Sequence, residues 1–251
     1  MNKNKIKQCF NRAYQSYDNA CQTQIHIANS LIKKIVELNN TYENVIDLGC
    51  GTGMITEMLA QQIQFKNFYA LDIADRLLER AHQRLRAYPI ELIETDFENF
   101  NYAQYDLIFS NMSLQWSSDF SAMLKTILSS LKTDGILAFS LPLQGTFCEL
   151  KSAFRNPFYP AKVIKKLLAE QNLQLLFSQS ETLSYTFSSP FLALKSIRAV
   201  GANYLFSAEK TARSKCNQLI NNVFSTKNLK KTPKLSYVLG NFIVKKNDDN
   251  A

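Results

Sequence analysis

The chain has 251 residues, of which 46% are hydrophobic and 12% aromatic. A chain of this length and apolar content buries a sizeable core, so a disordered, collagen-like or mini-protein class is excluded. The five cysteines are odd in number and none forms a C-x-x-C pair, so neither a disulfide framework nor a zinc ribbon is predicted. This favours a cytoplasmic compartment, and no signal peptide, membrane span or metal site is expected.

The charge is unevenly distributed along the chain. Residues 1–142 hold 13 basic and 15 acidic side chains, whereas residues 143–251 hold 16 basic and 6 acidic ones. A cationic C-terminal part suits an acidic partner, either nucleic acid or an acidic protein. General solubility explains the same charge equally well.

Strand and helix patterns alternate through the first two thirds of the chain. Two amphipathic helices are expected in residues 1–40. Strands are then expected at residues 45–48, 68–73, 90–96, 105–111 and 135–142, with helices at 54–63, 76–86 and 120–131. Repeated units of this kind predict a parallel sheet with helices on both faces.

The C-terminal third has a different pattern. Strands are expected at residues 173–177 and 183–187, and the last strand at 234–244. Residues 190 to about 224 are helical in pattern, which predicts a helical insertion over the site before the last strand. We therefore expect one domain, with an N-terminal helical cap (1–40), a cofactor-binding core (41–145) and the insertion (188–225).

Glycine is concentrated in one loop between a strand and a helix. Three of the seven glycines lie in Gly49-Cys50-Gly51-Thr52-Gly53, where backbone must turn tightly or approach a ligand. Asp72, 19 residues after Gly53 at the end of the next strand, is an acceptor for ribose hydroxyls. Met54 stands where a nicotinamide-type G-x-G-x-x-G loop has glycine, and Asp47 adds negative charge, which suits a cation. The sulfonium and ammonium of S-adenosylmethionine fit this loop.

Two further strand ends carry polar groups. Asp96 and Phe97 offer an acceptor for an adenine amino group and an aromatic face, and Ser110 and Asn111 end the next strand. These groups meet at the carboxyl edge of a parallel sheet, where open α/β folds bind ligands. The alternative is that Asp72 and Asp96 each cap the helix that follows.

Several sequence stretches resemble known families. VIDLGCGTG, ALDIAD, ETDFENF and YDLIFSNMSLQW resemble the class I S-adenosylmethionine-dependent methyltransferases over residues 40–145. FNRAYQSYDNACQTQ, LPLQGTFCELKSAF, ALKSIRAVGANYL and TPKLSYVLGNFIV are similar to the malonyl-acyl carrier protein O-methyltransferases of biotin synthesis, over nearly the whole chain. The resemblance implies a Rossmann-like fold with a mostly parallel seven-stranded sheet. It also implies methylation of the free carboxylate of a malonyl thioester, with S-adenosylmethionine as donor.

The resemblance also implies roles for particular residues. The residues implied to bind the cofactor are Tyr17, Gln24, Asp47, Gly49, Gly51, Gly53, Asp72, Ile73, Asp96, Phe97 and Asn111. Those implied to position the substrate are Tyr17, Gln115 and Trp116. The chain departs from the family at Ala199, where glycine is usual, and at Gln144-Gly145-Thr146 in place of a QGS turn.

The implied reaction needs positioning more than acid–base chemistry. A carboxyl group with a pKa of about 4 is ionised at neutral pH, so no general base is required. The carboxylate needs a counter-charge, for which Arg198 is the candidate, because its neighbours Leu194, Ile197 and Val200 have a buried pattern. The alternative is that Arg198 faces solvent. Docking of the acidic carrier protein is predicted among Lys151, Arg155, Lys162, Lys165, Lys166, Arg213 and Lys215.

Three other functions remain open. An RNA or DNA methyltransferase suits the basic charge, but Ser110-Asn111-Met112-Ser113 lacks the Asn/Asp-Pro-Pro-aromatic pattern that grips a base. A small-molecule carboxyl or C-methyltransferase and a non-catalytic cofactor-binding regulator share the fold class. His26 and His82 are isolated on helical patterns and are interpreted as surface or packing residues.

Overall fold

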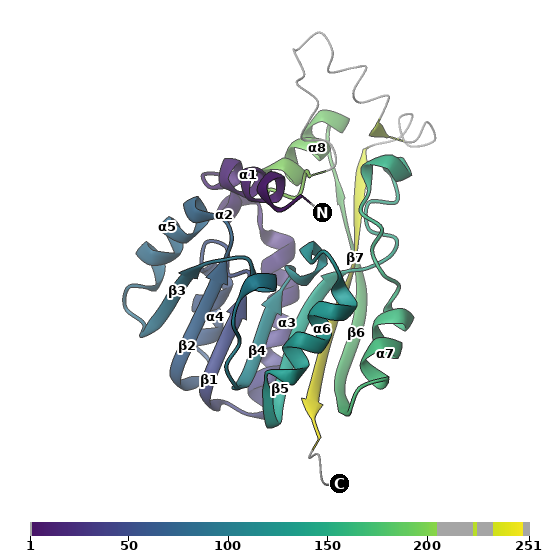
Figure 1. Cartoon of the computed structure of the whole chain (residues 1–251). Helices are drawn as coiled ribbons and strands as arrows, with labels where there is room; N and C mark the ends of the chain where they lie inside the picture. The colour runs from purple at the N-terminus through teal and green to yellow at the C-terminus, as the bar shows by residue number, and fades with distance from the viewer. Residues whose placement is uncertain (1, 205–222, 225–232, 248–251) are drawn as a thin grey trace.

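The computed structural model describes residues 2–204, 223–224 and 233–247. Seven strands form one sheet in the order β3-β2-β1-β4-β5-β7-β6 (Figure 1). The strands are β1 (Thr41–Leu48), β2 (Gln64–Asp72), β3 (Ile90–Glu94), β4 (Tyr105–Asn111), β5 (Leu131–Pro142), β6 (Leu173–Thr186) and β7 (Lys234–Lys246). Strand β7 runs antiparallel to both neighbours, and the other pairs are parallel. The predicted mostly parallel seven-stranded sheet is confirmed.

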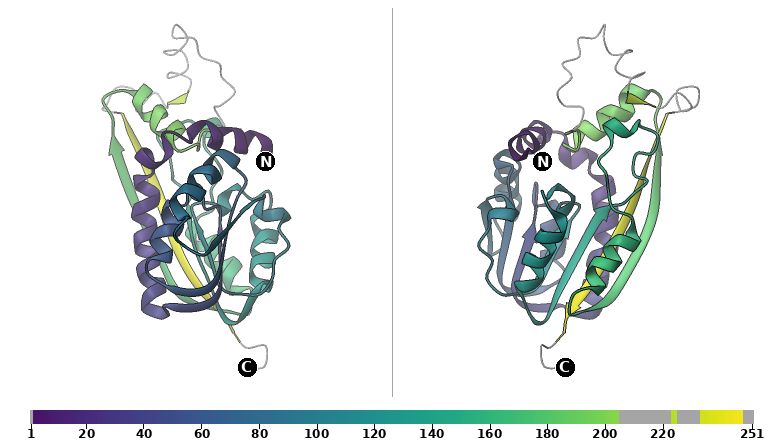
Figure 2. Two further views of the ribbon diagram at one scale, coloured as in Figure 1. Left: turned by 90° about the vertical axis from the view of Figure 1, so that its left-hand side faces the viewer. Right: turned by 45° about the vertical axis from the view of Figure 1, so that its right-hand side comes forward.

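Helices cover both faces of this sheet and the carboxyl ends of its parallel strands. They are α1 (Lys3–Ala13), α2 (Tyr17–Ala20), α3 (Gln22–Leu38), α4 (Met54–Ala60), α5 (Asp75–Leu85), α6 (Phe120–Ser129), α7 (Ala161–Ala169) and α8 (Pro190–Ala199). Helices α3, α4 and α5 pack on one face, and α6 and α7 on the other. Helices α1, α2 and α8 lie across the carboxyl ends of the parallel strands (Figures 1 and 2).

Alternation along the strands builds two core layers. In β1, Val45 packs with α3 and α4, whereas the next residue, Ile46, packs with α6 on the opposite face. Successive strand residues point to opposite faces, so a strand covered on both sides is apolar at every position. Helix α3 contributes a stripe that includes Ala28, Leu31 and Ile35, all fully buried at helical spacing. The two layers hold the sheet rigid, which fixes the positions of the strand ends.

The C-terminal third differs from the prediction in two ways. The strands expected at residues 173–177 and 183–187 are one continuous strand, β6, which pairs with β7 along its whole length. The run between them is polar because β6 is the edge strand of the sheet, so its alternate side chains face water. Helix α7 was not predicted. Of the helical pattern at 190–224, α8 covers the beginning, and residues 205–222 lie outside the described part of the chain.

Smaller differences concern element ends. The 1–40 segment holds a short third helix, α2, beside the two expected. The helix expected to end at Leu131 ends at Ser129, and β5 begins at Leu131 rather than Gly135. Residues 132–134, which lie between the expected helix and strand, form an irregular part of β5. There Asp134 has φ +60° and the pairing register with β4 shifts.

Candidate active site

The glycine loop joins β1 to α4, and its glycines serve different purposes. All three have positive φ, and the amides of Gly49 and Cys50 both donate to the Leu71 carbonyl. A Cβ on Gly49 would collide with the Ser113 side chain, and one on Gly53 would lie 2.9 Å from Leu85 of α5. A Cβ on Gly51 would have 3.8 Å to its nearest neighbour, the Tyr17 hydroxyl. Packing therefore requires glycine at two positions, whereas a Cβ at Gly51 would make ordinary contacts with Tyr17 and Leu77 and only its positive φ favours glycine.

Asp72 at the end of β2 binds this loop. Its Oδ2 accepts from the Gly51 amide at 2.8 Å and its Oδ1 from the Ala74 amide at 2.7 Å. Ala74 is the N-cap of α5 and no side chain caps that helix, so the capping alternative for Asp72 is wrong. Burial raises the pKa of Asp72 to about 6, although the amides of Ala74 and Gly51 favour the ionised form.

Asp96 does cap the short helix after it. Its Oδ1 accepts from the Glu98 amide at 3.1 Å. The Lys3 ammonium lies 3.2 Å from the same oxygen and donates to the Trp116 carbonyl at 3.1 Å. It also lies 5.0 Å from the centroid of the Phe97 ring. Lys3 thus fastens α1 to the ends of β3 and β4.

Asp47 is a buried carboxyl group in β1. It is 2% exposed, and its Oδ2 accepts from the Thr56 hydroxyl at 2.7 Å. Burial is the main reason why the pKa of Asp47 rises to about 7. The Thr56 hydrogen bond lowers the pKa and the nearby Asp72 charge raises it, and both effects are included in this value. A small cavity behind Tyr17 is lined by Asp47 and Gln24. A cation entering this cavity would meet a carboxyl group that water does not solvate.

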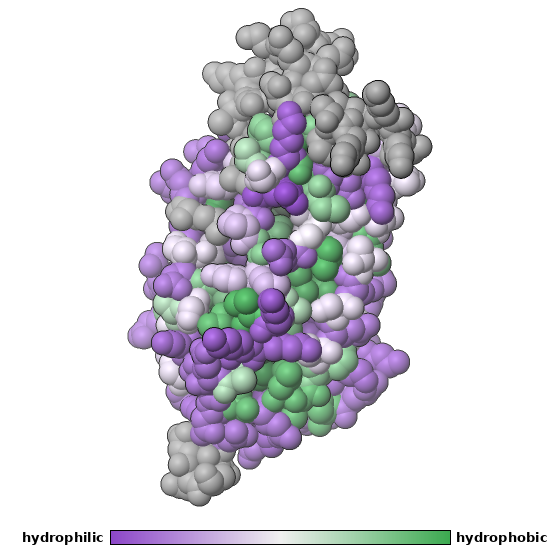
Figure 3. All heavy atoms as spheres, turned by 90° about the vertical axis from the view of Figure 1, so that its right-hand side faces the viewer, coloured by the Kyte–Doolittle hydropathy of each residue, from purple (hydrophilic) through white to green (hydrophobic). Residues whose placement is uncertain are grey.

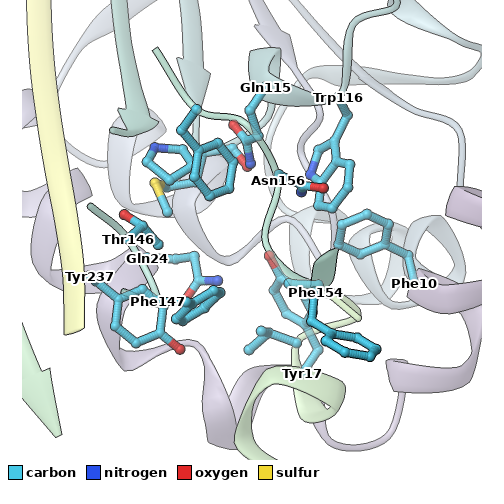
Figure 4. A pocket seen from close by; sticks show the side chains of 15 residues that line it. Phe10, Tyr17, Gln24, Gln115, Trp116, Thr146, Phe147, Phe154, Asn156 and Tyr237 are labelled. Atoms are coloured by element: carbon cyan, nitrogen blue, oxygen red, sulfur yellow. The ribbon is translucent and has the colours of Figure 1, made fainter. Parts of the chain in front are cut away.

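Two larger cavities meet above the strand ends. The first, here the loop cavity, has about 560 Å³ of open space and is lined by Lys3, Ile6, Phe10, Tyr17, Gly49, Gly51, Asp72, Ile73, Leu77, Asp96, Phe97, Asn111, Met112, Ser113 and Trp116. The second, the aromatic cavity, has about 690 Å³ and is lined by Phe10, Tyr17, Gln24, Met112, Gln115, Trp116, Pro142, Thr146, Phe147, Phe154, Asn156, Phe158, Val200, Ala202 and Tyr237 (Figure 4). Phe10, Tyr17, Met112 and Trp116 line both, so the cavities are adjacent.

The structure brings together most of the predicted site residues. Every one except Gly53 and Arg198 lines the loop cavity, the aromatic cavity or the small cavity behind Tyr17. Gly53 packs against α5 instead. Arg198 lies in the last turn of α8, half-buried, and its Nε is buried without a hydrogen-bond partner.

Gln115 has an unusual environment. It lies in the short helix η2 (Leu114–Trp116) after β4, and its Nε2 donates to the Met112 carbonyl at 2.6 Å. Its Oε1 is buried without a hydrogen-bond partner. A buried acceptor of this kind is costly unless a ligand supplies a donor.

Sequence reasoning missed several lining residues. Lys3 and Phe10 come from α1, Met112 directly follows β4, and Asn156 and Tyr237 come from the C-terminal third. Met112 has φ +54°, a strained conformation for a residue with a side chain, at the junction of the two cavities. No local sequence pattern announces these positions, because only the folded chain brings them to the strand ends.

An ion-pair network holds Tyr17 over the loop. Asp18, the next residue, accepts from Thr52 of the glycine loop at 2.6 Å and from Arg84 of α5 at 2.9 Å. Burial would raise the pKa of Asp18, but the bonds from Arg84 and Thr52 lower it below its usual value. The cap helices are thereby tied to the loop that they cover.

The fold and the site define a class I S-adenosylmethionine-dependent methyltransferase. Residues 46–139 match the family model described as a methyltransferase domain. A putative methyltransferase from Bacillus halodurans shares the fold (12% identity, 86% of this chain and 97% of that chain, TM-score 0.63). So does the N-methyltransferase NodS from Bradyrhizobium japonicum in complex with S-adenosyl-L-homocysteine (16% identity, 93% and 98%, TM-score 0.52).

The full-length similarity narrows the class. The Malonyl-[acyl-carrier protein] O-methyltransferase 2 of Coxiella burnetii is 36% identical over 97% of this chain and 96% of its own length. The chain belongs to the malonyl-[acyl-carrier protein] O-methyltransferase family. Within the described residues, no helix is both long and apolar enough to cross a membrane. The same residues contain no group of three or more His, Cys, Asp or Glu side chains placed to hold a metal ion.

Proposed function

We propose that this protein transfers the methyl group of S-adenosylmethionine to the free carboxylate of malonyl-acyl carrier protein, an early step of biotin synthesis. The observation that carries the proposal is the junction of the loop cavity with the aromatic cavity at Tyr17, Met112 and Trp116. The relatives that match nearly the whole chain bear the name of this activity.

The loop cavity has the acceptor and the space that the cofactor needs. Gly51 lines this cavity without a side chain and so admits a nucleoside, Asp72 accepts from ribose hydroxyls, and Ile73 and Phe97 offer apolar faces. Asp47 faces the methionine end, where its carboxylate compensates positive charge. When bound, S-adenosylmethionine supplies an electrophilic methyl group on a sulfonium.

The protein's own residues have to align the carboxylate with the methyl group and keep water out of the site. Methyl transfer requires the carboxylate oxygen in line with the methyl carbon at about 3–3.5 Å, in a site without water. The aromatic cavity is walled by Phe10, Trp116 and Phe147, which exclude water. Burial raises the pKa of Tyr17 well above its usual value, so its hydroxyl stays protonated and donates to the carboxylate.

Arg198 is proposed as the counter-charge of the carboxylate. Among the described residues that line the aromatic cavity there is no Lys or Arg. Arg198 lies two residues before Val200, which does line it, and its Nε is buried and unpaired. Arg198→Ala should raise KM for malonyl thioester about tenfold or more and leave the cofactor Kd unchanged. Equal kinetics in the variant would remove Arg198 from the proposal.

The acidic carrier protein is proposed to dock near α7. Lys162, Lys165 and Lys166 of α7 are exposed at the β6 end of the molecule, and Figure 3 shows this face as hydrophilic groups surrounding apolar patches. Arg155 is half-buried just before α7. Arg213 and Lys215, also predicted, lie outside the described residues. The proposal keeps a cytoplasmic location, since the four cysteines in the described ranges are free.

Intact-mass analysis tests the proposal. Malonyl-, succinyl- and acetyl-carrier proteins are incubated with the enzyme and S-adenosylmethionine. A single base-labile methyl gain on the malonyl form, absent from the acetyl form, is expected. No gain despite measurable cofactor binding would contradict the proposal and favour the small-molecule alternative. Steep salt-dependent binding of RNA or DNA would instead favour the nucleic-acid alternative.

A further inference from the structure

A further cavity adjoins the aromatic cavity on the side of α6 and α7. This side cavity has about 660 Å³ of open space and is lined by Gln115, Ser117, Ser118, Phe120, Leu141, Pro142, Asn156, Pro157, Phe158 and Tyr159. Gln115, Pro142, Asn156 and Phe158 line the aromatic cavity as well, so the two cavities are adjacent. At its outer end Ser118, Pro157 and Tyr159 are exposed to solvent. The side cavity therefore joins the molecular surface to the aromatic cavity.

The side cavity is lined by both aromatic and polar side chains. Phe120 and Tyr159 form an aromatic wall, with ring centroids 5.6 Å apart. Ser118 and Asn156 add polar groups, and Gln115 presents its unpaired, buried Oε1 at the junction. Because the Gln115 Nε2 is already bound to the Met112 carbonyl, the free group at the junction is an acceptor that can take a hydrogen bond from a ligand.

We infer that the side cavity is the channel for the pantetheine arm of the carrier-bound substrate, and that Gln115 Oε1 accepts from the arm's amide N–H nearest the thioester. This inference rests on the proposed function. The arm is a linear chain that alternates apolar carbons with amides, which matches a narrow cavity with aromatic walls and isolated polar groups.

Charge around the opening supports the same occupant. Arg155 and Lys162 flank the segment 156–159 that lines the side cavity. A carrier protein is acidic, so it would be held at these cations while its arm reaches inward. Neither the loop cavity nor the small cavity behind Tyr17 shares this opening, because their linings do not include residues 156–159.

A bulky side chain at the outer end of the side cavity tests whether the pantetheine arm passes through it. Ser118→Trp should lower kcat/KM for malonyl-acyl carrier protein about tenfold or more, and leave malonyl ethyl thioester, which has no arm, within about twofold. Ser129→Trp, at the far end of α6 and lining none of these cavities, is the matched control. This control should retain wild-type activity, and the cofactor Kd should be unchanged in both variants.

Failure of the channel proposal and failure of the proposed function would give different results in these experiments. Unchanged activity of Ser118→Trp on the carrier substrate, or an equal loss with both substrates, would overturn the channel while the function stands. Wild-type enzyme that methylates no malonyl thioester would overturn the proposed function itself and the channel's occupant with it.

The hydrogen bond proposed for Gln115 Oε1 is tested by comparing two small thioester substrates that differ in one amide group. Wild-type enzyme should use malonyl-N-acetylcysteamine, which carries one amide, with a kcat/KM about tenfold above that of malonyl ethyl thioester. Gln115→Leu should reduce this ratio to near one with the cofactor Kd unchanged. A ratio that survives in Gln115→Leu would overturn the assignment of Oε1.

Discussion

At the scale of single residues, Asp47 is the clearest conflict between stability and function. A buried carboxyl group bound by one hydroxyl favours its protonated form, which is why its pKa rises to about 7. The native state therefore binds more protons than the unfolded chain between about pH 4 and 7, and the free energy of unfolding falls as pH rises through this range. The cofactor-free enzyme is destabilised at neutral pH by a group that a bound cation would compensate.

Asp47→Asn should reveal this cost. Without cofactor, the variant should be more stable than wild type at pH 8 by a few kcal/mol, and the difference should shrink toward pH 5. Thermal unfolding at the two pH values measures it. The variant should also bind S-adenosylmethionine at least about tenfold more weakly by calorimetry. A variant less stable than wild type at pH 8 would contradict the explanation.

Gly51 and Gly53 offer a matched pair in one loop. Both have positive φ, so alanine costs about 1 kcal/mol of backbone strain at either position. The methyl group of Gly51→Ala would project toward Tyr17 in the loop cavity, whereas that of Gly53→Ala would press on α5. We expect Gly51→Ala to lose mainly cofactor affinity and Gly53→Ala mainly thermal stability. Calorimetry and thermal unfolding of both variants check this, and equal loss of affinity in the two would contradict it.

At the scale of elements, the Lys3 end of α1 is held over the loop cavity by contacts with residues of the site. Its Lys3 ammonium contacts Asp96 and Glu98, donates to the Trp116 carbonyl and lies over the Phe97 ring. Asp96 and Phe97 line the cavity where the nucleoside is proposed to bind. The helix therefore closes the cavity through a side chain whose partners belong to the site.

Lys3→Ala should loosen this closure. We expect cofactor dissociation to accelerate several-fold in stopped-flow measurements, with little change in thermal stability, because partly exposed ion pairs contribute about 0–1 kcal/mol. Arg12→Ala, in the exposed last turn of the same helix, is the control and should dissociate at the wild-type rate. Identical rates in Lys3→Ala and wild type would show that the other contacts of α1, among them the Lys7 ion pairs with Asp75 and Glu94, hold the helix without Lys3.

At the scale of the whole molecule, the excess positive charge lies on the C-terminal part of the chain. The exposed lysines of α7 belong to this part, on a helix that packs against the edge strand β6. Long-range attraction between a cationic surface and an acidic partner raises the association rate and is screened by salt. The molecule is thus polarised, with the cofactor side near neutral charge.

Salt should therefore affect the carrier-bound substrate selectively. KM for malonyl-acyl carrier protein is expected to rise several-fold between about 50 and 300 mM salt, while KM for a small malonyl thioester stays nearly constant. Reversal of two charges, Lys162→Glu with Lys165→Glu, should raise KM for the carrier substrate even at low salt. Lys33→Glu, exposed on α3, serves as the control. Salt-independent kinetics on the carrier substrate would place docking on apolar contacts instead.

The sequence by itself determined the parallel part of the sheet and the loop that approaches the cofactor. Strands β1, β4 and β5 are buried on both faces over most of their length, so each contains an apolar run that local pattern reveals. The glycine loop, Asp72 and Asp96 follow strand ends, and parallel strands deliver such residues to one edge of the sheet without further information.

Only the tertiary structure decided the rest of the site. The aromatic cavity draws Phe10 from α1, Asn156 from a loop and Tyr237 from β7, which are far apart in the chain. The continuity of β6 depended on its pairing with β7, a segment that no local window contains. Hydrophobic periodicity records which face of an element is buried, but what meets across that face is set by packing between distant segments, because burial energy is non-directional.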